Sequence, residues 1–538
     1  GPPLQSFLIR GATVVDGSGG PPLRADVEVE GDRIRSVGPD LPKTAAQVID
    51  GRGLTLSPGF IDIHSHTDGT IFKHPRSESK ILQGVTTEVV GNCGIGFFPV
   101  DPRRADLLAG YVRVMDFHLP PGGFSWTDFS GFAAAVERLR PGVNVAPLAG
   151  HGALRIAEMG ADDRAPSEAE LAGMKSLLEK VLRQGAWGMS TGLIYPPGTF
   201  AATDELIALA KIVARFDAVY TSHIRGESGT LLAAIDEAIR IGREGGARVE
   251  ISHLKAMGKD YWGMGKQLLE KLEKARAEGV DITADQYPYE ATSTSLAAML
   301  PAWAQSGGLG EILKKLAAPE LQPRLRADIL QAMTTRGGPD RVLIAAVGSP
   351  EGVALSGKTV ARVAALWSCP PEDAVIRILL QEKAAVRAVY FSLAETDVEA
   401  IMASPHVAVG SDGEGMNAEE DAAATTHPRS YGTFPRVLGR YAREKGILSL
   451  PLAVYKMTGL PASRLRLPER GLLKPGYAAD LVLFDQDKII DTADFQNPHR
   501  YASGIVHVWV NGVQEVSDGR LIGNTGGRVL RKNNTSHS

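Results

Sequence analysis

The chain of 538 residues lacks several features that mark particular classes of protein. Its two cysteines, Cys93 and Cys369, are too few for a disulfide framework in a chain of this size, which favours a reducing compartment. Lys and Arg number 58 against 62 Asp and Glu, so a net charge of −4 gives no reason to expect nucleic acid or an anionic membrane as partner. The sequence shows no secretory leader, and no apolar run approaches the roughly 18 residues of a membrane span. These absences predict a cytoplasmic protein that acts on a small molecule, and they leave its oligomeric state open.

The remaining composition is that of a large globular protein. Hydrophobic residues make up 43% of the chain and charged residues 22%, which argues against disorder because ample apolar surface is available for burial. The 60 glycines indicate many tight turns. A chain of this length is expected to form more than one structural unit.

Alternating β-branched residues, broken by glycine-containing turns, mark both ends of the chain. They run through FLIRGATVVDG and ADVEVEGDRIRSVG near the start, and through ADLVLFD and IVHVWVNGVQEV near the end. Asn511-Gly512, in the last of these segments, is a typical hairpin turn. We therefore expect residues 4–57 and 470–530 to build one small β-sandwich domain together.

Between these ends, strand-like and helix-like segments alternate. In SEAELAGMKSLLEKVLRQ the apolar residues recur at helical spacing, and Ser167 and Glu170 are spaced as a capping box. The alternation predicts parallel strands with crossover helices, and eight such strands would form a TIM-like (β/α)8 barrel over residues 58–469. The eight candidate strands are residues 59–66, 85–92, 143–149, 186–191, 218–223, 248–253, 281–287 and 407–412.

Residues 291 to about 388 exceed any ordinary connection between strands. They contain further helical and strand-like pieces, so we expect a long insertion that forms a lid over the barrel mouth. A doubly wound open sheet is the competing architecture, but no G-x-G-x-x-G motif follows an early strand to support a nucleotide site.

Potential metal ligands follow or close five of the candidate strands. In a TIM barrel the catalytic groups lie at the carboxyl ends of the strands, so these residues would meet at one mouth. The set consists of His64, His66, Cys93, His223, His253 and Asp412. Each has an ordinary alternative as a surface histidine, a small buried thiol or a turn residue, but their common position favours a metal site.

The spacing and chemistry of these residues indicate zinc. Two histidines one residue apart, His64 and His66, point to the same side of a strand and can close on one ion. A thiolate ligand from Cys93 favours zinc over magnesium or calcium. Zinc with an open coordination position activates water and polarises a carbonyl, which predicts a hydrolase. Asp412 is then placed to take a proton from water and pass it to a leaving nitrogen.

The sequence resembles the N-acyl-D-amino-acid deacylases, or D-aminoacylases, of the amidohydrolase superfamily. Matching motifs occur in order over residues 57–485: SPGFIDIHSHTD, GVTTEVVGNCGIG, SHIRGE, ISHLK, DQYPY, VGSDG, HPRSYGTFPRVLG and LKPGYAADLVLFD. Most amidohydrolases with two metals bridge them through a carboxylated lysine on a barrel strand, and this chain has no lysine on a predicted strand between His66 and His223. In the deacylases a cysteine takes the bridging place, and Cys93 matches it.

The resemblance implies roles for individual residues. Cys93, His223 and His253 would hold a tight zinc ion, while His64, His66, Cys93 and Asp412 outline a second, weaker position; the number of metals needed stays open. The residues that match the family's anchor for the substrate's α-carboxylate are Lys255, Tyr287 and Arg429, with Ser293 as a further polar contact. Lys255 and Arg429 are also compatible with solvated surface charges. The acidic segment GEGMNAEEDAAATT before Arg429 departs from the family's pattern.

These observations predict the zinc-dependent hydrolysis of an N-acyl-D-amino acid to a carboxylate and a free D-amino acid. We expect a neutral or hydrophobic side chain, because the sequence identifies no further basic group for an acidic one. The alternatives are an N-acyl-D-glutamate or N-acyl-D-aspartate deacylase, another amide or dipeptide hydrolase on the same site, and a non-catalytic ligand-binding barrel.

Overall fold

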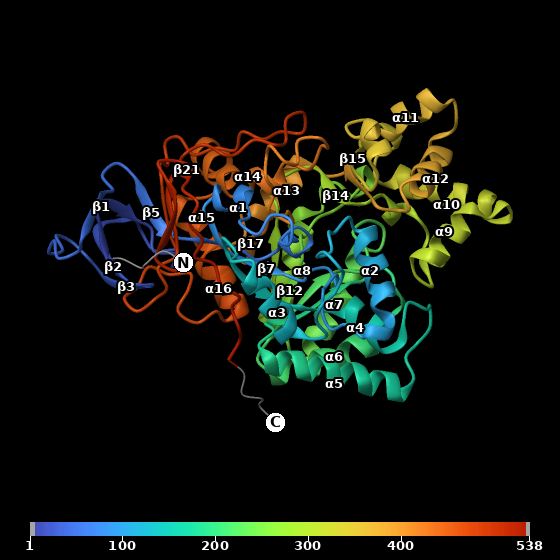
Figure 1. The fold of residues 1–538 in the computed structure, drawn as a ribbon, viewed down its shortest axis with the longest axis horizontal. Helices are drawn as coiled ribbons and strands as arrows, with labels where there is room; N and C mark the ends of the chain where they lie inside the picture. Colours follow the sequence, from blue (N-terminus) through green and yellow to red (C-terminus); the bar gives the residue numbers. More distant parts are fainter. Residues whose placement is uncertain (1–5, 534–538) are drawn as a thin grey trace.

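The computed structural model describes residues 6–533, which form three regions along the longest axis (Figure 1). A small β domain lies at one end, a ring of parallel strands surrounded by helices occupies the centre, and the insertion lies at the other end. A TIM-like barrel with a small second domain is therefore confirmed. Among residues 6–533, no helix combines the length and the apolar character that a bilayer crossing requires.

Parallel strands build the barrel in two hydrogen-bonded groups. The first contains β6 (Phe60–Asp62), β7 (Val85–Val90) and β8 (Asn144–Pro147); the second runs in the order β9 (Ala149–Gly150), β10 (Gly188–Gly192), β11 (Val219–His223), β12 (Arg248–Ile251), β13 (Ile282–Gln286) and β17 (Val407–Val409). Only Leu148 separates β8 from β9. On the opposite side, a parallel bridge between Ser65 and Gly413 links the chain after β6 to the chain after β17, which closes the ring.

Helices connect and cover these strands. Outside the insertion they are α1 (Glu78–Ile81), α2 (Ala105–Val114), α3 (Phe129–Arg138), α4 (His151–Met159), α5 (Glu168–Gln184), α6 (Thr203–Arg215), α7 (Leu231–Gly245), α8 (Gly265–Ala277), α13 (Glu395–Met402), α14 (Arg429–Arg436), α15 (Leu450–Met457) and α16 (Gly459–Leu465). α5 begins with the predicted capping box: the Ser167 hydroxyl accepts from the Glu170 N–H at 3.1 Å, and the Glu170 carboxylate accepts from the Ser167 N–H at 2.9 Å. These bonds satisfy N–H groups that a helix start leaves unpaired.

Both chain ends contribute to the small domain. Its strands are β1 (Phe7–Val14), β2 (Leu23–Glu30), β3 (Arg33–Gly38), β4 (Gln47–Asp50), β5 (Thr55–Pro58), β18 (Leu481–Phe484), β19 (Ile505–Val510), β20 (Val513–Ser517) and β21 (Arg520–Leu521). Hydrogen bonds link all nine into one sheet, in which the antiparallel pair β5 and β18 joins the two ends of the chain. Asn511 and Gly512, with φ of 50° and 79°, form the tight turn between β19 and β20.

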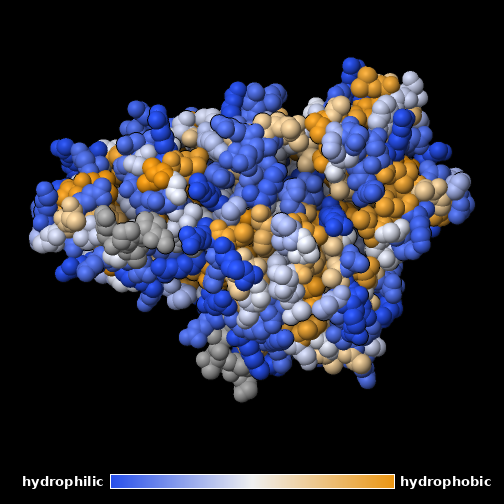
Figure 2. Space-filling model, viewed as in Figure 1, coloured by the Kyte–Doolittle hydropathy of each residue, from blue (hydrophilic) through white to orange (hydrophobic). Residues whose placement is uncertain are grey.

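The insertion folds around a hydrophobic core of its own. It contains β14 (Thr292–Ser295), α9 (Leu309–Ala317), α10 (Gln322–Thr335), β15 (Val342–Val347), α11 (Val360–Trp367), α12 (Pro371–Gln381) and β16 (Val386–Tyr390). The antiparallel sheet β14-β16-β15 lies between the barrel and these helices. Ile329, Met333 and Leu379 are fully buried in this core. Hydrophobic residues also gather on its surface (Figure 2). Leu366, on α11, is 52% exposed.

Candidate metal centre

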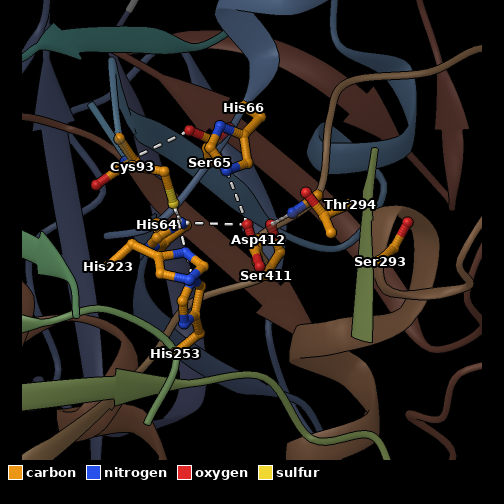
Figure 3. Close-up of polar contacts among 12 residues, drawn as sticks. His64, Ser65, His66, Cys93, His223, His253, Ser293, Thr294, Ser411 and Asp412 are labelled. Carbon is orange, nitrogen blue, oxygen red and sulfur yellow. Dashed lines mark hydrogen bonds and ion pairs between the residues drawn. The ribbon is translucent and has the colours of Figure 1, made fainter. Parts of the chain in front are cut away.

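The six predicted ligand residues lie together at the carboxyl end of the barrel strands (Figure 3). They form two groups that share Cys93, and within each group one ligand atom per residue lies within 4.8 Å of the others. The first group is His64, His66, Cys93 and Asp412; the second is Cys93, His223 and His253. All six side chains are buried.

Unusual backbone conformations aim three of these side chains. Cys93, His253 and Asp412 have φ of 60°, 38° and 53°, and each follows its barrel strand by two or three residues. The left-handed region costs a non-glycine residue about 1 to 2 kcal/mol. Gly192 accommodates the turn at Cys93, because a Cβ there would lie 1.9 Å from the Cys93 carbonyl oxygen. Such strain commonly occurs where function requires a particular side-chain direction.

The ligand atoms contact one another directly. The Cys93 Sγ lies 3.5 Å from His64 Nε2 and 3.6 Å from His253 Nε2. Asp412 Oδ1 lies 2.8 Å from His66 Nε2 and 3.2 Å from His64 Nε2. Burial alone would raise the pKa of the Cys93 thiol, but the surrounding histidines lower it well below its ordinary value. The thiolate is the form of cysteine that binds metals.

The donor set fits a metal ion, and two ring nitrogens support this. Within residues 6–533, the buried Nδ1 atoms of His66 and His223 have no hydrogen-bond partner. Buried polar atoms are rarely left unpaired, so each such atom calls for a ligand, a water or an ion. Soft sulfur together with imidazole nitrogen and a carboxylate oxygen is the chemistry of a zinc site.

Two carboxylates, Glu227 and Asp285, contact the histidines of the candidate site. The sequence analysis did not single them out. Glu227 lies 3.1 Å from His253 Nδ1 and 3.3 Å from His223 Nε2. Asp285 accepts from the backbone N–H of His253 at 2.7 Å and lies 3.5 Å from His64 Nδ1. Such contacts fix the tautomer and the ring orientation of ligating histidines. Both residues belong to quoted motifs, SHIRGE and DQYPY, and Glu227 stands four residues after His223.

Lys80, between His66 and His223 in the sequence, is fully buried and lies on α1 rather than on a strand. Its ammonium donates to Asp62 at 2.8 Å and to Glu88 at 2.6 Å, and all three side chains are fully buried. Asp62 in turn accepts from the backbone N–H of Ser411 at 2.9 Å, next to Asp412. Lys80 therefore holds the strand ends in place and pairs with carboxylates.

The predicted substrate-binding residues surround one side of the centre. Arg429, the first residue of α14, lies 3.3 Å from Asp412 Oδ2, donates to the Ser293 carbonyl at 3.0 Å, and stacks 4.7 Å from the centre of the Tyr287 ring. The Ser293 hydroxyl has no partner within residues 6–533. Lys255 donates to Glu227 at 2.6 Å and lies 5.5 Å from the Tyr287 ring.

These residues line two neighbouring cavities. Ser293 and Arg429 line the cavity that contains His66, Cys93, His253 and Asp412. Lys255 and Tyr287 line an adjacent cavity that also contacts His253. The arrangement places cationic and hydroxyl groups beside a potential metal centre, which suits a small anionic ligand.

Known proteins similar to this chain have related chemistry. The amidohydrolase family matches residues 47–515. The chain is 38% identical to the N-acyl-D-aspartate deacylase of Alcaligenes xylosoxydans xylosoxydans over 523 residues, 97% of this chain and 94% of that protein. It is 37% identical to the D-aminoacylase of the same organism over 538 residues, 98% of this chain and 97% of that protein.

A similar solved structure is the N-acyl-D-glutamate deacylase from Bordetella bronchiseptica, complexed with zinc and a phosphonate inhibitor that mimics the tetrahedral intermediate of the reaction. The TM-score is 0.81 at 35% identity, and the match covers 98% of this chain and 100% of that chain. The resemblance to the N-acyl-D-amino-acid deacylases is confirmed by these relatives, and the chain belongs to the amidohydrolase family.

Proposed function

We propose that the protein hydrolyses N-acyl-D-amino acids to a carboxylate and a free D-amino acid, with zinc as cofactor. The observation that carries the proposal is the buried group Cys93, His223 and His253, with Asp412 beside it and Arg429 in the same cavity. The relatives named for deacylation of D-amino acids, matched over nearly their whole length, give the reaction class and the stereochemistry. The side chain that the enzyme prefers is neutral or hydrophobic.

Cys93, His223 and His253 would hold the tight zinc ion, and His64, His66, Cys93 and Asp412 outline the second, weaker position. Zinc at this site would supply Lewis acidity, which polarises an amide carbonyl and makes water more acidic. Glu227, 3.1 Å from Nδ1 of His253, would keep that ring in orientation, and Asp285 holds the backbone N–H of His253. By the resemblance, the shared Cys93 thiolate would take the place that a carboxylated lysine has in most two-metal members of the superfamily.

Asp412 would accept a proton from the attacking water and deliver it to the departing nitrogen. Burial raises the pKa of its carboxyl group, but Arg429 and His64 outweigh that effect and hold the pKa well below its ordinary value. The side chain is therefore an anion at neutral pH, which is the form that a proton acceptor needs. Its contact with His66 at 2.8 Å fixes its direction.

Arg429, Lys255 and Tyr287 would hold the α-carboxylate of the substrate, with Ser293 as a further donor. Charged hydrogen bonds to a carboxylate each contribute about 1.5 to 3 kcal/mol, and a guanidinium can form two in parallel. The insertion at 291–388 supplies Ser293 and would act as a lid that excludes water from the cavity. A non-catalytic barrel would have no need of the paired proton acceptor and carboxylate anchor.

Chiral product analysis tests the proposal. The purified zinc-loaded protein is given racemic N-acetyl-methionine and racemic N-acetyl-glutamate, with Cys93→Ala as the control. The expected product is free D-methionine, absent in the control. Turnover of neither substrate by protein that retains its zinc would overturn the hydrolysis of simple N-acetyl amino acids and favour larger acyl groups or other amides.

A further inference from the structure

A partly buried arginine that sequence reasoning did not single out lies at the edge of the cavity beside the candidate metal centre. Arg387, on β16, lines this cavity together with Arg429 and Asp412. Its guanidinium forms an ion pair with Glu414 and donates to the Met115 carbonyl at 3.0 Å. The Arg387 side chain is 14% exposed and that of Glu414 is 6% exposed. The pair also lines a second cavity further from the metal ligands, so it separates the two spaces.

The backbone on both sides holds the pair in place. Arg387 pairs with Ser295 in the antiparallel register of β14 and β16. The Glu414 N–H donates to the Ser430 hydroxyl at 3.1 Å, and the Glu414 carbonyl accepts from the Ser79 hydroxyl at 3.2 Å. Because the backbone is anchored at both residues, the Arg387 guanidinium and the Glu414 carboxylate have fixed positions in the cavity wall.

The same register places Arg387 within reach of a bound amino acid's side chain. Ser293 and Ser295 face the same side of β14, so Ser293 is a diagonal neighbour of Arg387, at a distance of about 7 to 8 Å in such sheets. The Ser293 carbonyl accepts from Arg429, which is the proposed anchor of the α-carboxylate. A substrate whose α-carboxylate binds Arg429 therefore needs a side chain only a few bonds long to reach Arg387.

Three of the other residues that line this cavity are apolar, namely Ile95, Met115 and Phe117. The Tyr195 and Thr294 hydroxyls, which also line it, pair with each other at 2.8 Å. Burial lowers the pKa of the Arg387 guanidinium, and the negative charge of Asp116 opposes that effect. A side-chain carboxylate in this space would have to displace Glu414 or lie beside it, and like charges in a buried site repel strongly.

We propose that the Arg387–Glu414 ion pair sets the charge of the side chain that the enzyme accepts. Glu414 neutralises Arg387, so the wild-type protein selects substrates with uncharged side chains that pack against Met115 and Phe117. Removal of the Glu414 charge exposes Arg387 as an anchor for acidic side chains. This inference rests on the proposed deacylase function and assigns its substrate class.

The experiment compares kcat/KM for N-acetyl-D-glutamate and N-acetyl-D-methionine in the zinc-loaded full chain. The readout is the ratio of the two values within each variant, so a general loss of activity cancels. Wild type favours methionine, and Glu414→Gln raises the glutamate-to-methionine ratio about tenfold or more, the effect of one charged hydrogen bond. Arg387→Met alone changes the ratio in the opposite direction, because it leaves Glu414 unpaired.

Two further variants separate charge masking from other effects. Glu414→Gln combined with Arg387→Met loses the gain, because the guanidinium that it exposes is absent. Glu419→Gln removes an exposed charge from the same segment and should keep the wild-type ratio. An unchanged ratio in Glu414→Gln, or a wild-type preference for glutamate that Arg387→Met abolishes, overturns the inference while the deacylase function stands. Hydrolysis of neither substrate by wild type would instead refute the deacylation of N-acetyl-D-amino acids on which the inference rests.

Discussion

Replacement of Asp412 by asparagine separates proton transfer from metal binding. Asparagine has nearly the same shape, so the contacts with His66 at 2.8 Å and with Arg429 at 3.3 Å can persist, but an amide cannot accept a proton from water. A positioned general acid–base group contributes about 10² to 10⁴-fold to a rate, equivalent to about 3 to 5 kcal/mol. We therefore expect Asp412→Asn to lower kcat by that factor. Zinc should stay bound, since the proposed tight set does not include Asp412.

The assay is steady-state hydrolysis of N-acetyl-D-methionine, combined with the zinc content and melting temperature of each variant. The variant leaves Arg429 without its charged partner, at a stability cost of about 1 to 3 kcal/mol, so the melting temperature establishes that the protein is folded. Asp421→Asn is the matched control, because Asp421 also pairs with a histidine, His74 at 2.9 Å, outside the metal centre. A near-normal kcat in folded, zinc-loaded Asp412→Asn would refute the proton-transfer role.

Three further predictions concern the metal and the buried charges. Cys93→Ala should lose tight zinc and all turnover, and full zinc content by elemental analysis would contradict the ligand assignment. Glu227→Gln should weaken zinc binding about 10 to 100-fold in a competition assay with a chelator, because it releases the His253 ring; unchanged affinity would argue against this role. Burial lowers the pKa of Lys456 to about 7, so between about pH 7 and 10.5 the unfolded chain binds the extra proton and folding gains stability as the pH rises. Lys456→Met should remove this gain, measured as a difference in unfolding free energy from wild type that changes between about pH 7.5 and about pH 9.5.

Local sequence patterns were sufficient for much of the fold. The period-two alternation at both chain ends predicts the strands of the small domain, and Asn511-Gly512 predicts its hairpin turn. The capping box at Ser167 marks the start of α5. In the barrel, the strand ends carry the six predicted ligands, because parallel strands in a closed ring bring their carboxyl ends to one mouth.

Contacts that depend on tertiary pairing could not be predicted in this way. Lys80 lies on the short helix α1. No local sequence pattern indicates that it is fully buried or that it pairs with Asp62 and Glu88. Arg387 enters the cavity because β16 pairs with β14, which lies far earlier in the chain, and a single sequence contains no signal for that pairing. The sequence identified no further basic group near the substrate's side chain, whereas the structure places Arg387 in the wall of the cavity.

The backbone at the metal centre indicates what the site is built for. Cys93, His253 and Asp412 adopt left-handed conformations, and neighbouring hydrogen bonds enforce two of them: the Asp412 N–H donates to the His64 carbonyl at 2.7 Å, and the His253 N–H donates to Asp285 at 2.7 Å. A relaxed backbone at these positions would cost less and would direct the side chains elsewhere. Because these three residues also supply ligand atoms to the two groups, their strained backbone supports a role in binding or chemistry.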